Sequence, residues 1–258
     1  MIEILPIFTH SPLRNFSYIV YSNRTGEAYV IDPFDAKSIL TYTKQFGVKI
    51  KGILNTHEHG DHTQGNLELK EETKAIIYGH TNAKDKIPGL DQILKEGDIV
   101  FSAEEESLVV WDTPGHTFSH LSFVRKNPNT ILGIFSGDTL FNAGVGNCFR
   151  GGDPNALYDT IQSRFETLPD TCLLYPGHDY WDNNLKFSCH IDPENEFRNS
   201  YKTSLKPFQV SEIGAEKKLN PFFRRNTDSV KDRLTELKES FSDERSVFLT
   251  LRRLRDQW

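Results

Sequence analysis

Three histidines and an aspartate lie within one short segment, residues 57–62 (HEHGDH), directly after a hydrophobic run that predicts a strand. Side chains alternate between faces in an extended chain, so His57 and His59 point the same way and Glu58 points the opposite way. A glycine then permits a bend, and Asp61 and His62 can face the same space from the start of a helix. Imidazole nitrogen and carboxylate oxygen suit zinc, iron or manganese. We therefore expect two metal ions, one held through His57 and His59 and the other through Asp61 and His62.

The same pattern recurs at three later points in the sequence. A predicted strand ends, a glycine follows, and a residue that can ligate a metal comes next. These residues are His116, Asp138 and His178, each directly after its glycine. Rigid strands with functional loops at one edge commonly assemble a site from distant parts of a sequence. We expect the three residues to join the same site.

The remaining sequence predicts the elements that position these loops. Short runs rich in β-branched and aromatic residues predict strands over residues 2–8, 15–21, 27–32, 50–54, 75–78, 98–101, 107–112, 121–125, 130–136 and 172–175. Apolar spacing predicts helices over 36–46, 64–73, 156–167, 183–190, 194–201, 229–241 and 247–258. The alternation of strands and helices indicates an α/β architecture with mixed sheets, followed by a small helical domain after about residue 180.

Composition excludes several classes of protein. The chain has 258 residues, 26% of them charged and 37% hydrophobic, which is typical of a globular chain. No apolar run approaches the roughly 20 residues that a transmembrane helix needs. The N-terminus lacks the features of a secretion signal, so we expect a cytoplasmic protein. Three cysteines without CxxC spacing argue against a disulfide framework and a thiolate zinc site.

Charge is distributed unevenly along the chain. Residues 1–200 contain 17 Lys and Arg against 27 Asp and Glu, whereas residues 201–258 contain 13 against 9, so the two parts carry −10 and +4. The basic tail either meets something anionic or presents a solvated basic helix face. The whole chain carries −6, which disfavours binding to nucleic acid.

These motifs resemble those of the metallo-β-lactamase superfamily, and more narrowly of the glyoxalase II (hydroxyacylglutathione hydrolase) family. The resemblance covers nearly the whole chain and includes the HxHxDH motif and the run from Gly177 to Phe187. It implies a four-layer αβ/βα metallo-β-lactamase-type sandwich with a C-terminal helical substrate-binding domain. The implied boundaries are 1–180 for the catalytic domain and 181–258 for the helical domain.

The resemblance also implies a ligand set and an activity. The first metal would take His57, His59 and His116, the second would take Asp61, His62 and His178, and Asp138 would bridge both. Zinc is the expected metal, with iron or manganese as alternatives. The implied reaction is hydrolysis of glutathione thioesters, S-D-lactoylglutathione to D-lactate and glutathione, by a hydroxide that bridges two metal ions. Asp61 or Asp138 would orient that hydroxide.

Substrate contacts are implied by the same family. Arg252 and Arg255 match its cationic positions, and guanidinium groups pair well with the carboxylates of glutathione. Tyr180 matches a tyrosine that contacts the substrate. Asn147 stands where the family commonly has lysine, and Phe149 where it has tyrosine. The expected partner is therefore a small-molecule glutathione thioester, bound by a monomer.

Other readings of the sequence stay open at this point. A persulfide dioxygenase with a single iron, a lactonase or another thioester hydrolase would share this fold, and a metal-stabilised interaction module would need no reaction. Asp61 and His62 favour a site with two metals. We expect Glu58 to be structural or to support a ligand, and we expect His120 to be structural and Cys148 to be a packing residue.

Overall fold

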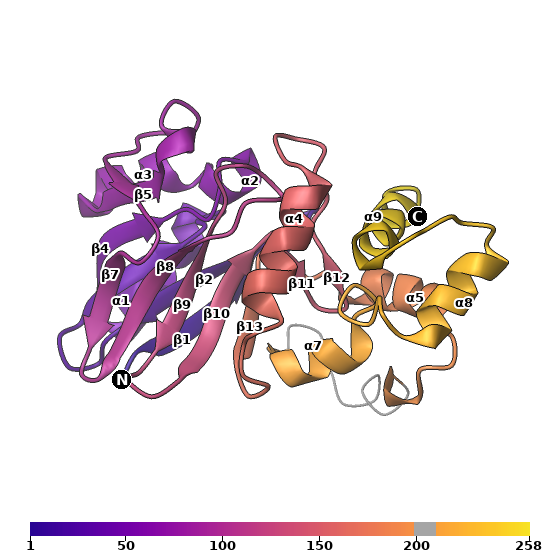
Figure 1. Ribbon diagram of the computed structural model, residues 1–258. Helices are drawn as coiled ribbons and strands as arrows, with labels where there is room; N and C mark the ends of the chain where they lie inside the picture. The colour runs from indigo at the N-terminus through magenta and orange to yellow at the C-terminus, as the bar shows by residue number, and fades with distance from the viewer. Residues whose placement is uncertain (199–209) are drawn as a thin grey trace.

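Two six-stranded mixed sheets pack face to face in the computed structural model, which describes residues 1–198 and 210–258 (Figure 1). The first sheet contains, in spatial order, β1 (Glu3–Phe8), β2 (Phe16–Tyr21), β3 (Glu27–Ile31), β4 (Lys49–Leu54), β5 (Ile76–His80) and β6 (Gln92–Leu94). Its first three strands form an antiparallel meander, and β3 to β6 run parallel. The crossovers between the parallel strands include α1 (Ala36–Phe46) and α3 (Asn66–Thr73).

The second sheet has the order β14 (Ser211–Glu212), β13 (Leu173–Pro176), β10 (Ile131–Gly137), β9 (Leu121–Lys126), β8 (Glu106–Asp112) and β7 (Ile99–Ala103). β10 pairs parallel with β13, and both β8 and β10 pair antiparallel with β9. β8, β10 and β13 therefore run in the same direction. Their carboxyl ends meet at one edge of the sheet, and the loops that follow them lie together there.

Helices cover the outer face of each sheet. α1 and α3 pack on the first sheet. Asp35 caps the start of α1, where its side chain accepts from two backbone N–H groups, and Gly47 caps the end in the left-handed region. α4 (Pro154–Thr160) packs on the second sheet and continues as a π-helical turn, η2 (Ile161–Phe165), so the helix predicted over 156–167 changes geometry in its second half. The C-terminal helices are α5 (Trp181–Ile191), α7 (Ile213–Leu219), α8 (Asp228–Glu236) and α9 (Glu244–Asp256).

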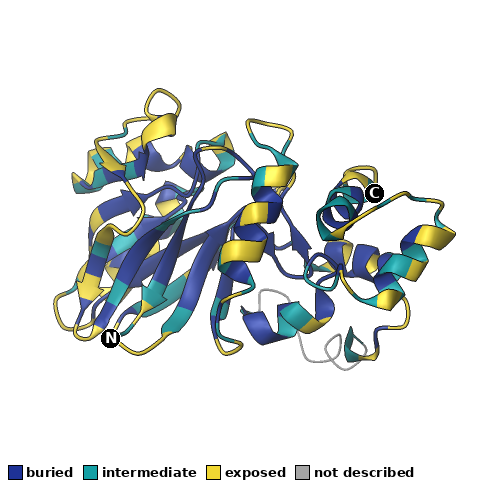
Figure 2. Cartoon of the chain, viewed as in Figure 1, coloured by how far each residue is buried: buried dark blue, intermediate teal, exposed yellow. Residues whose placement is uncertain are grey.

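Buried residues, dark blue in Figure 2, lie along the facing strands and helices of these layers. One cluster joins the two sheets and includes Tyr18, Phe123 and Phe135. A second lies between the first sheet and α1 and α3. A third lies outside the second sheet and continues from α4 into α5, α8 and α9, so the helical tail shares its core with the sandwich. The αβ/βα layering and the helical C-terminal part confirm the expected fold class.

The structure adds elements that the sequence pattern did not reveal. They are β6, β14, α7, the short hairpin β11 (Leu140–Phe141) and β12 (Gly144–Val145), and two short turns of helix, α2 (Gly60–Thr63) and η1 (Thr81–Ala83). Most have two to four residues, too few to show a period. The helix predicted over 194–201 runs into residues 199–209, which lie outside the described part of the chain. None of the described helices combines the length and the hydropathy that a bilayer crossing requires.

Glu216 of α7 ties the helical tail to the hairpin between β11 and β12. Its buried carboxylate accepts hydrogen bonds from Ala143 N (2.7 Å), Ser211 Oγ (3.1 Å), Asn220 Nδ2 (3.3 Å) and Asn142 Nδ2 (3.4 Å). Burial raises the pKa of Glu216 to about 7 against the opposing effect of these donors. The carboxyl group therefore titrates near neutral pH in the folded chain.

This titration should make the folded chain less stable as pH rises. The carboxyl group ionises at a pKa of 4.5 when unfolded and of about 7 when folded, so the folded state holds the extra proton between these values. The contribution of Glu216 to the free energy of unfolding should fall across that window by about 3 kcal/mol. Urea unfolding at pH 5 and pH 8 measures it, and Glu216→Gln should remove that part of the pH dependence. The same pH dependence in both proteins would contradict this role.

Candidate metal centre

Four loops meet at one edge of the sandwich. They follow β4, β8, β10 and β13, and together with α2 they carry all seven residues that the sequence nominated as ligands. Backbone hydrogen bonds join the loops: Leu121 N donates to Thr56 O (2.7 Å), and Gly177 N donates to Gly137 O (2.8 Å). Because the loops bond directly to one another and to rigid strands, the ligand side chains start from well-defined positions.

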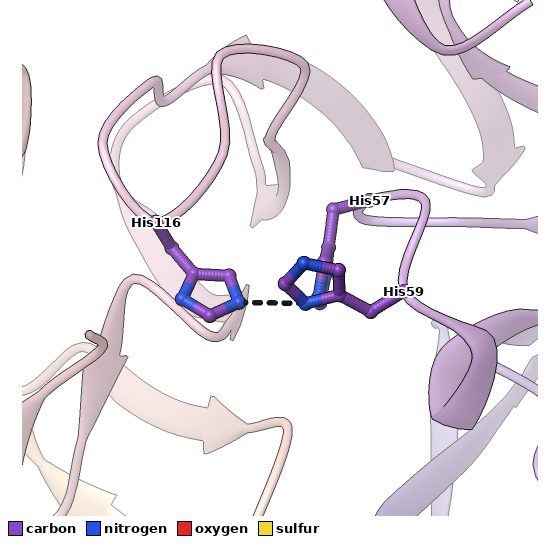
Figure 3. A group of neighbouring side chains, drawn as sticks. All are labelled: His57, His59 and His116. Carbon is purple, nitrogen blue, oxygen red and sulfur yellow. Dashed lines mark hydrogen bonds between the residues drawn. The ribbon is translucent and has the colours of Figure 1, made fainter. Parts of the chain in front are cut away.

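His57, His59 and His116 point their rings toward one another (Figure 3). His59 Nδ1 lies 3.0 Å from His57 Nε2 and 3.0 Å from His116 Nε2. His57 and His116 are buried, and His59 is partly exposed at the mouth of the site. Three imidazole nitrogens at this spacing can hold one divalent ion and leave a further position open.

Asp61, His62 and His178 form a second group beside the first. His62 Nε2 lies 3.1 Å from His178 Nε2, and Asp61 Oδ2 lies 3.4 Å from each of these nitrogens. Asp61 and His62 come from α2, whereas His178 follows β13. Two nitrogens and one carboxylate oxygen can hold a second divalent ion.

Asp138 lies between the two groups. Its Oδ2 is 3.4 Å from His116 Nε2 in the first group and 3.3 Å from His178 Nε2 in the second. Its Oδ1 is 3.4 Å from His62 Nε2. One carboxylate therefore contacts ligand nitrogens of both groups, which is the geometry that a bridging ligand requires.

Each of the five histidines has its other ring nitrogen engaged by the protein. The partners are Thr56 Oγ1 for His57 (3.0 Å), Arg150 O for His59 (3.0 Å), Asp32 Oδ2 for His62 (3.0 Å), Asn147 O for His116 (2.6 Å) and Leu13 O for His178 (2.8 Å). For four of them the partner is a carbonyl or carboxylate oxygen, which accepts a hydrogen bond from the ring N–H that faces it. In the neutral ring the nitrogen that faces the centre then carries a lone pair, as a metal ligand must.

This donor set fits a pair of cations. His59 Nδ1 and His116 Nε2 lie 3.0 Å apart, and unprotonated nitrogens at this distance repel one another unless positive charge lies between them. Burial lowers the pKa of His57 and His116, which keeps both rings neutral. Asp138 Oδ1 is buried and has no hydrogen-bond donor among the described residues, so it too lacks a partner that an ion would supply.

The carboxylates around His62 also favour a positive charge between them. Burial by itself would lower the pKa of His62, but Asp138, Asp32 and Asp61 raise it to about 10. In the absence of an ion the centre therefore holds a proton on His62 to balance its acids. A divalent cation satisfies the same acids and frees the nitrogen to act as a ligand.

Asp32 is a supporting residue that the sequence analysis missed. It follows β3 with a positive φ of 49° and accepts from Thr56 N (2.7 Å) and Thr56 Oγ1 (2.6 Å) as well as contacting His62 Nδ1. Asn15 has a comparable role, because its Nδ2 donates to Asp61 Oδ2 (2.9 Å). The only sign in the sequence was an aspartate at the end of the strand predicted over residues 27–32, and such a sign is weak.

Asp32→Asn should weaken metal binding at the second group by about 10- to 100-fold, because it removes the charge that orients His62 and raises its basicity. Competition with a chromophoric chelator measures this affinity. Asp35→Asn is a matched control. Asp35 lies three residues after Asp32, caps α1 and contacts none of the candidate ligands. Equal metal affinity in Asp32→Asn and the unchanged chain would exclude this supporting role.

A cavity of about 190 Å³ lies beside the centre and contains all five predicted substrate contacts. It is lined by Phe141, Val145, Asn147, Phe149, Tyr180, Asn184, Arg252, Arg255 and Asp256. Tyr180 connects it to the centre, because its ring stacks on His178 at 4.7 Å between centroids with an interplanar angle of 5°. The helical tail and the sandwich thus both contribute walls to the cavity.

The two arginines of this cavity differ in their surroundings. Arg252 is buried, and its guanidinium donates to Val145 O (2.7 Å), Gly146 O (3.0 Å) and Asp256 Oδ1 (2.7 Å). Arg255 is half-buried and donates to a single acceptor, Asn184 Oδ1, through Nε (3.3 Å) and Nη2 (3.0 Å). Arg255 is therefore the arginine that can readily exchange its neutral partner for a carboxylate.

Three further residues behave as expected from the sequence. Glu58 points away from the metal ligands and accepts from Ser119 Oγ (2.8 Å) and Lys86 Nζ (3.0 Å). His120 is structural, since its Nε2 accepts from Asp138 N (3.1 Å) and its Nδ1 contacts Thr113 Oγ1 (2.9 Å). Cys148 packs against the core that joins sandwich and tail, and burial raises the pKa of its thiol to about 12, so it stays protonated at neutral pH.

Known protein families match nearly the whole chain. The family model of the metallo-beta-lactamase superfamily matches residues 11–178, and that of the hydroxyacylglutathione hydrolase C-terminus matches residues 179–258. A hydroxyacylglutathione hydrolase from Nitrosococcus oceani is 43% identical over 98% of this chain and 98% of its own. Another from a Polaromonas species is 41% identical with the same coverage. Among solved structures, ETHE1 from Myxococcus xanthus has a TM-score of 0.69 at 23% identity, covers 98% of both chains and shows likeness of fold.

Proposed function

The chain belongs to the metallo-β-lactamase superfamily and, within it, to the hydroxyacylglutathione hydrolase family, and on this premise we propose that it hydrolyses S-D-lactoylglutathione to D-lactate and glutathione. The observation that carries this proposal is the convergence of five imidazoles and two carboxylates beside a cavity that contains arginines. A hydrolase for an anionic thioester needs both features, one for the reaction and one for the substrate.

We assign the ions as the family resemblance implies. The first would be held by His57, His59 and His116, the second by Asp61, His62 and His178, and both by Asp138. Zinc is the proposed metal, with iron or manganese as alternatives. When bound, such ions supply a nucleophilic water at neutral pH and polarise the thioester carbonyl.

The chain's own residues would orient and protect the reacting groups. Asp61 and Asp138 would accept hydrogen bonds from the attacking water and aim it at the carbonyl carbon. Asn15 fixes the Asp61 carboxylate for this task. The departing thiol has a pKa of about 8.5 and can leave as thiolate, so no dedicated general acid is required. Burial and nearby carboxylates raise the pKa of Tyr180, which keeps its hydroxyl available as a hydrogen-bond donor.

We propose that the peptide part of glutathione occupies the cavity lined by Asn147, Phe149, Tyr180, Arg252 and Arg255. Arg255 supplies a guanidinium for a carboxylate. Asn147 supplies an amide and no charge, so affinity for the anionic substrate depends on the arginines more than it would with a lysine at position 147. Residues 1–180 would form the catalytic domain and part of the cavity wall, and residues 181–258 would form the helical domain that completes substrate binding. We further propose a cytoplasmic monomer with no nucleic-acid partner.

An assay panel tests this function. The metal-loaded chain is given glutathione thioesters, coenzyme A thioesters and lactones, and its metal content is measured by elemental analysis. Two ions per chain with selective turnover of glutathione thioesters is the expected result. One iron with oxygen consumption on a persulfide substrate would favour the dioxygenase. Lactone turnover would redirect the substrate assignment, and bound metal without turnover of any substrate would favour an interaction module.

A further inference from the structure

We propose that Arg252 is a positioning residue for the metal centre: from α9 it holds the backbone of residues 145–147 and thereby sets the orientation of His116. The inference rests on the metal centre proposed above and concerns a residue that the family resemblance places in substrate binding. It follows from three sets of contacts that connect the C-terminal helix to a ligand of the first group.

The first set surrounds the guanidinium. Arg252 is only 5% exposed, and its Nη1 donates to two consecutive carbonyls, Val145 O (2.7 Å) and Gly146 O (3.0 Å). Its Nη2 donates to Asp256 Oδ1 one turn further along α9 (2.7 Å), which fixes the guanidinium from the other side. A buried cation with these partners is held in a fixed position by the protein, although its side chain also lines the cavity. A substrate carboxylate that approached it would compete with Asp256.

The second set joins the held backbone to His116. The carbonyl next in sequence, Asn147 O, contacts His116 Nδ1 at 2.6 Å. That contact selects the tautomer that presents Nε2 to His59 Nδ1 and Asp138 Oδ2. A shift of the peptide groups at 145–147 would therefore turn the His116 ring away from the first group.

The third set shows that this backbone has little room to adjust. Gly146 N donates to Thr139 O (3.2 Å). A Cβ built at Gly146 would lie 1.8 Å from Asp138 O and 3.1 Å from His116 Nδ1. The backbone at residue 146 is thus packed directly against both the bridging aspartate and the histidine. Arg252 holds this backbone in that position from the side of the helical tail.

The test is a separate measurement of metal affinity at each group. Arg252→Met keeps an unbranched side chain similar to the aliphatic part of arginine and removes the guanidinium donors. Chelator competition should show the first group weakened by about 10-fold or more, in the range found when groups that orient a ligand are lost. The second group should change much less than the first, because the ring nitrogens of His62 and His178 are oriented by Asp32 and Leu13 and not by residues 145–147. The ligand-field spectrum of the cobalt-substituted chain should change for one ion and not for the other.

Arg253→Met is the matched control, because Arg253 is the next residue on α9, is exposed and pairs with Glu239. It should leave both affinities unchanged. Arg252→Lys keeps the charge and one donor nitrogen, so it should weaken the first group less than Arg252→Met does. If the methionine variant does not fold, an unchanged first-group affinity in the lysine variant overturns the inference and a selective loss supports it.

The inference and the proposed function can fail separately. Unchanged metal affinity in Arg252→Met, together with a raised KM for glutathione thioesters, would make Arg252 a substrate contact and would leave the hydrolase intact. Selective loss at the first group in a chain that hydrolyses no thioester would confirm the positioning role and reject the reaction.

Discussion

Asp138→Ala is expected to lose metal and thioesterase activity together while the chain stays folded. Asp138 is the one candidate ligand, among the described residues, whose carboxylate contacts histidine nitrogens of both groups. Its removal takes a ligand from each ion and leaves the five imidazoles with less negative charge to balance a pair of cations. Activity should fall by about a thousandfold or more, since metal ions contribute several kcal/mol of transition-state stabilisation and about 1.4 kcal/mol corresponds to tenfold.

Elemental analysis and circular dichroism, measured on the same preparation, check this expectation. Asp192→Asn provides a control for the loss of a buried carboxylate, because Asp192 is fully buried in the helical tail, where it accepts from Arg224 Nε (2.6 Å) and Asn195 Nδ2 (3.0 Å). That variant should lose stability and keep its metal. Two ions retained in Asp138→Ala would refute the bridging role of Asp138.

Arg255→Ala should raise KM for glutathione thioesters and leave kcat nearly unchanged. A hydrogen bond between charged groups contributes about 1.5–3 kcal/mol, which corresponds to about a 10- to 100-fold change in KM. The effect on a small uncharged thioester should be slight, since such a substrate offers no carboxylate to the guanidinium. Steady-state kinetics on both substrates separate the two cases.

Arg253→Ala is the control for this measurement, as it removes an arginine from the exposed side of the same helix. A similar rise in KM for charged and uncharged substrates in Arg255→Ala would exclude Arg255 from carboxylate recognition.

The double variant Arg252→Ala with Arg255→Ala should add a loss of metal from the first group to the rise in KM, because the two arginines contact different partners.

Many of the helices and strands, and the residues that are candidate metal ligands, could be predicted from local sequence. α1 begins and ends at the predicted residues because Asp35 and Gly47 supply local capping signals that depend on no distant contact. His57 and His59 share a face because alternation in an extended segment is a local property. His116, Asp138 and His178 could be proposed as metal ligands because each follows a predicted strand and a glycine. Nothing in their local sequence says how far apart they lie in space.

Tertiary structure alone decided which groups support the ligands. Asp32 contacts His62 across 30 positions of sequence, and Arg252 contacts Val145 across 107. Neither contact produces a periodic or compositional pattern in the sequence. Each depends on two elements that meet only after the sheets and the tail have packed. The hairpin between β11 and β12, which carries the backbone held by Arg252, is too short for any pattern to predict.

The sequence by itself determined the type and order of the groups that can bind metal, because residue identity and local backbone preference depend only on neighbouring positions in the chain. The folded chain decided which nitrogen of each histidine faces the centre, which carboxylate lies between the two groups, and which partners each cavity arginine contacts. Those properties depend on distances of about 3 Å between side chains from separate elements, and only the packing of those elements sets such distances.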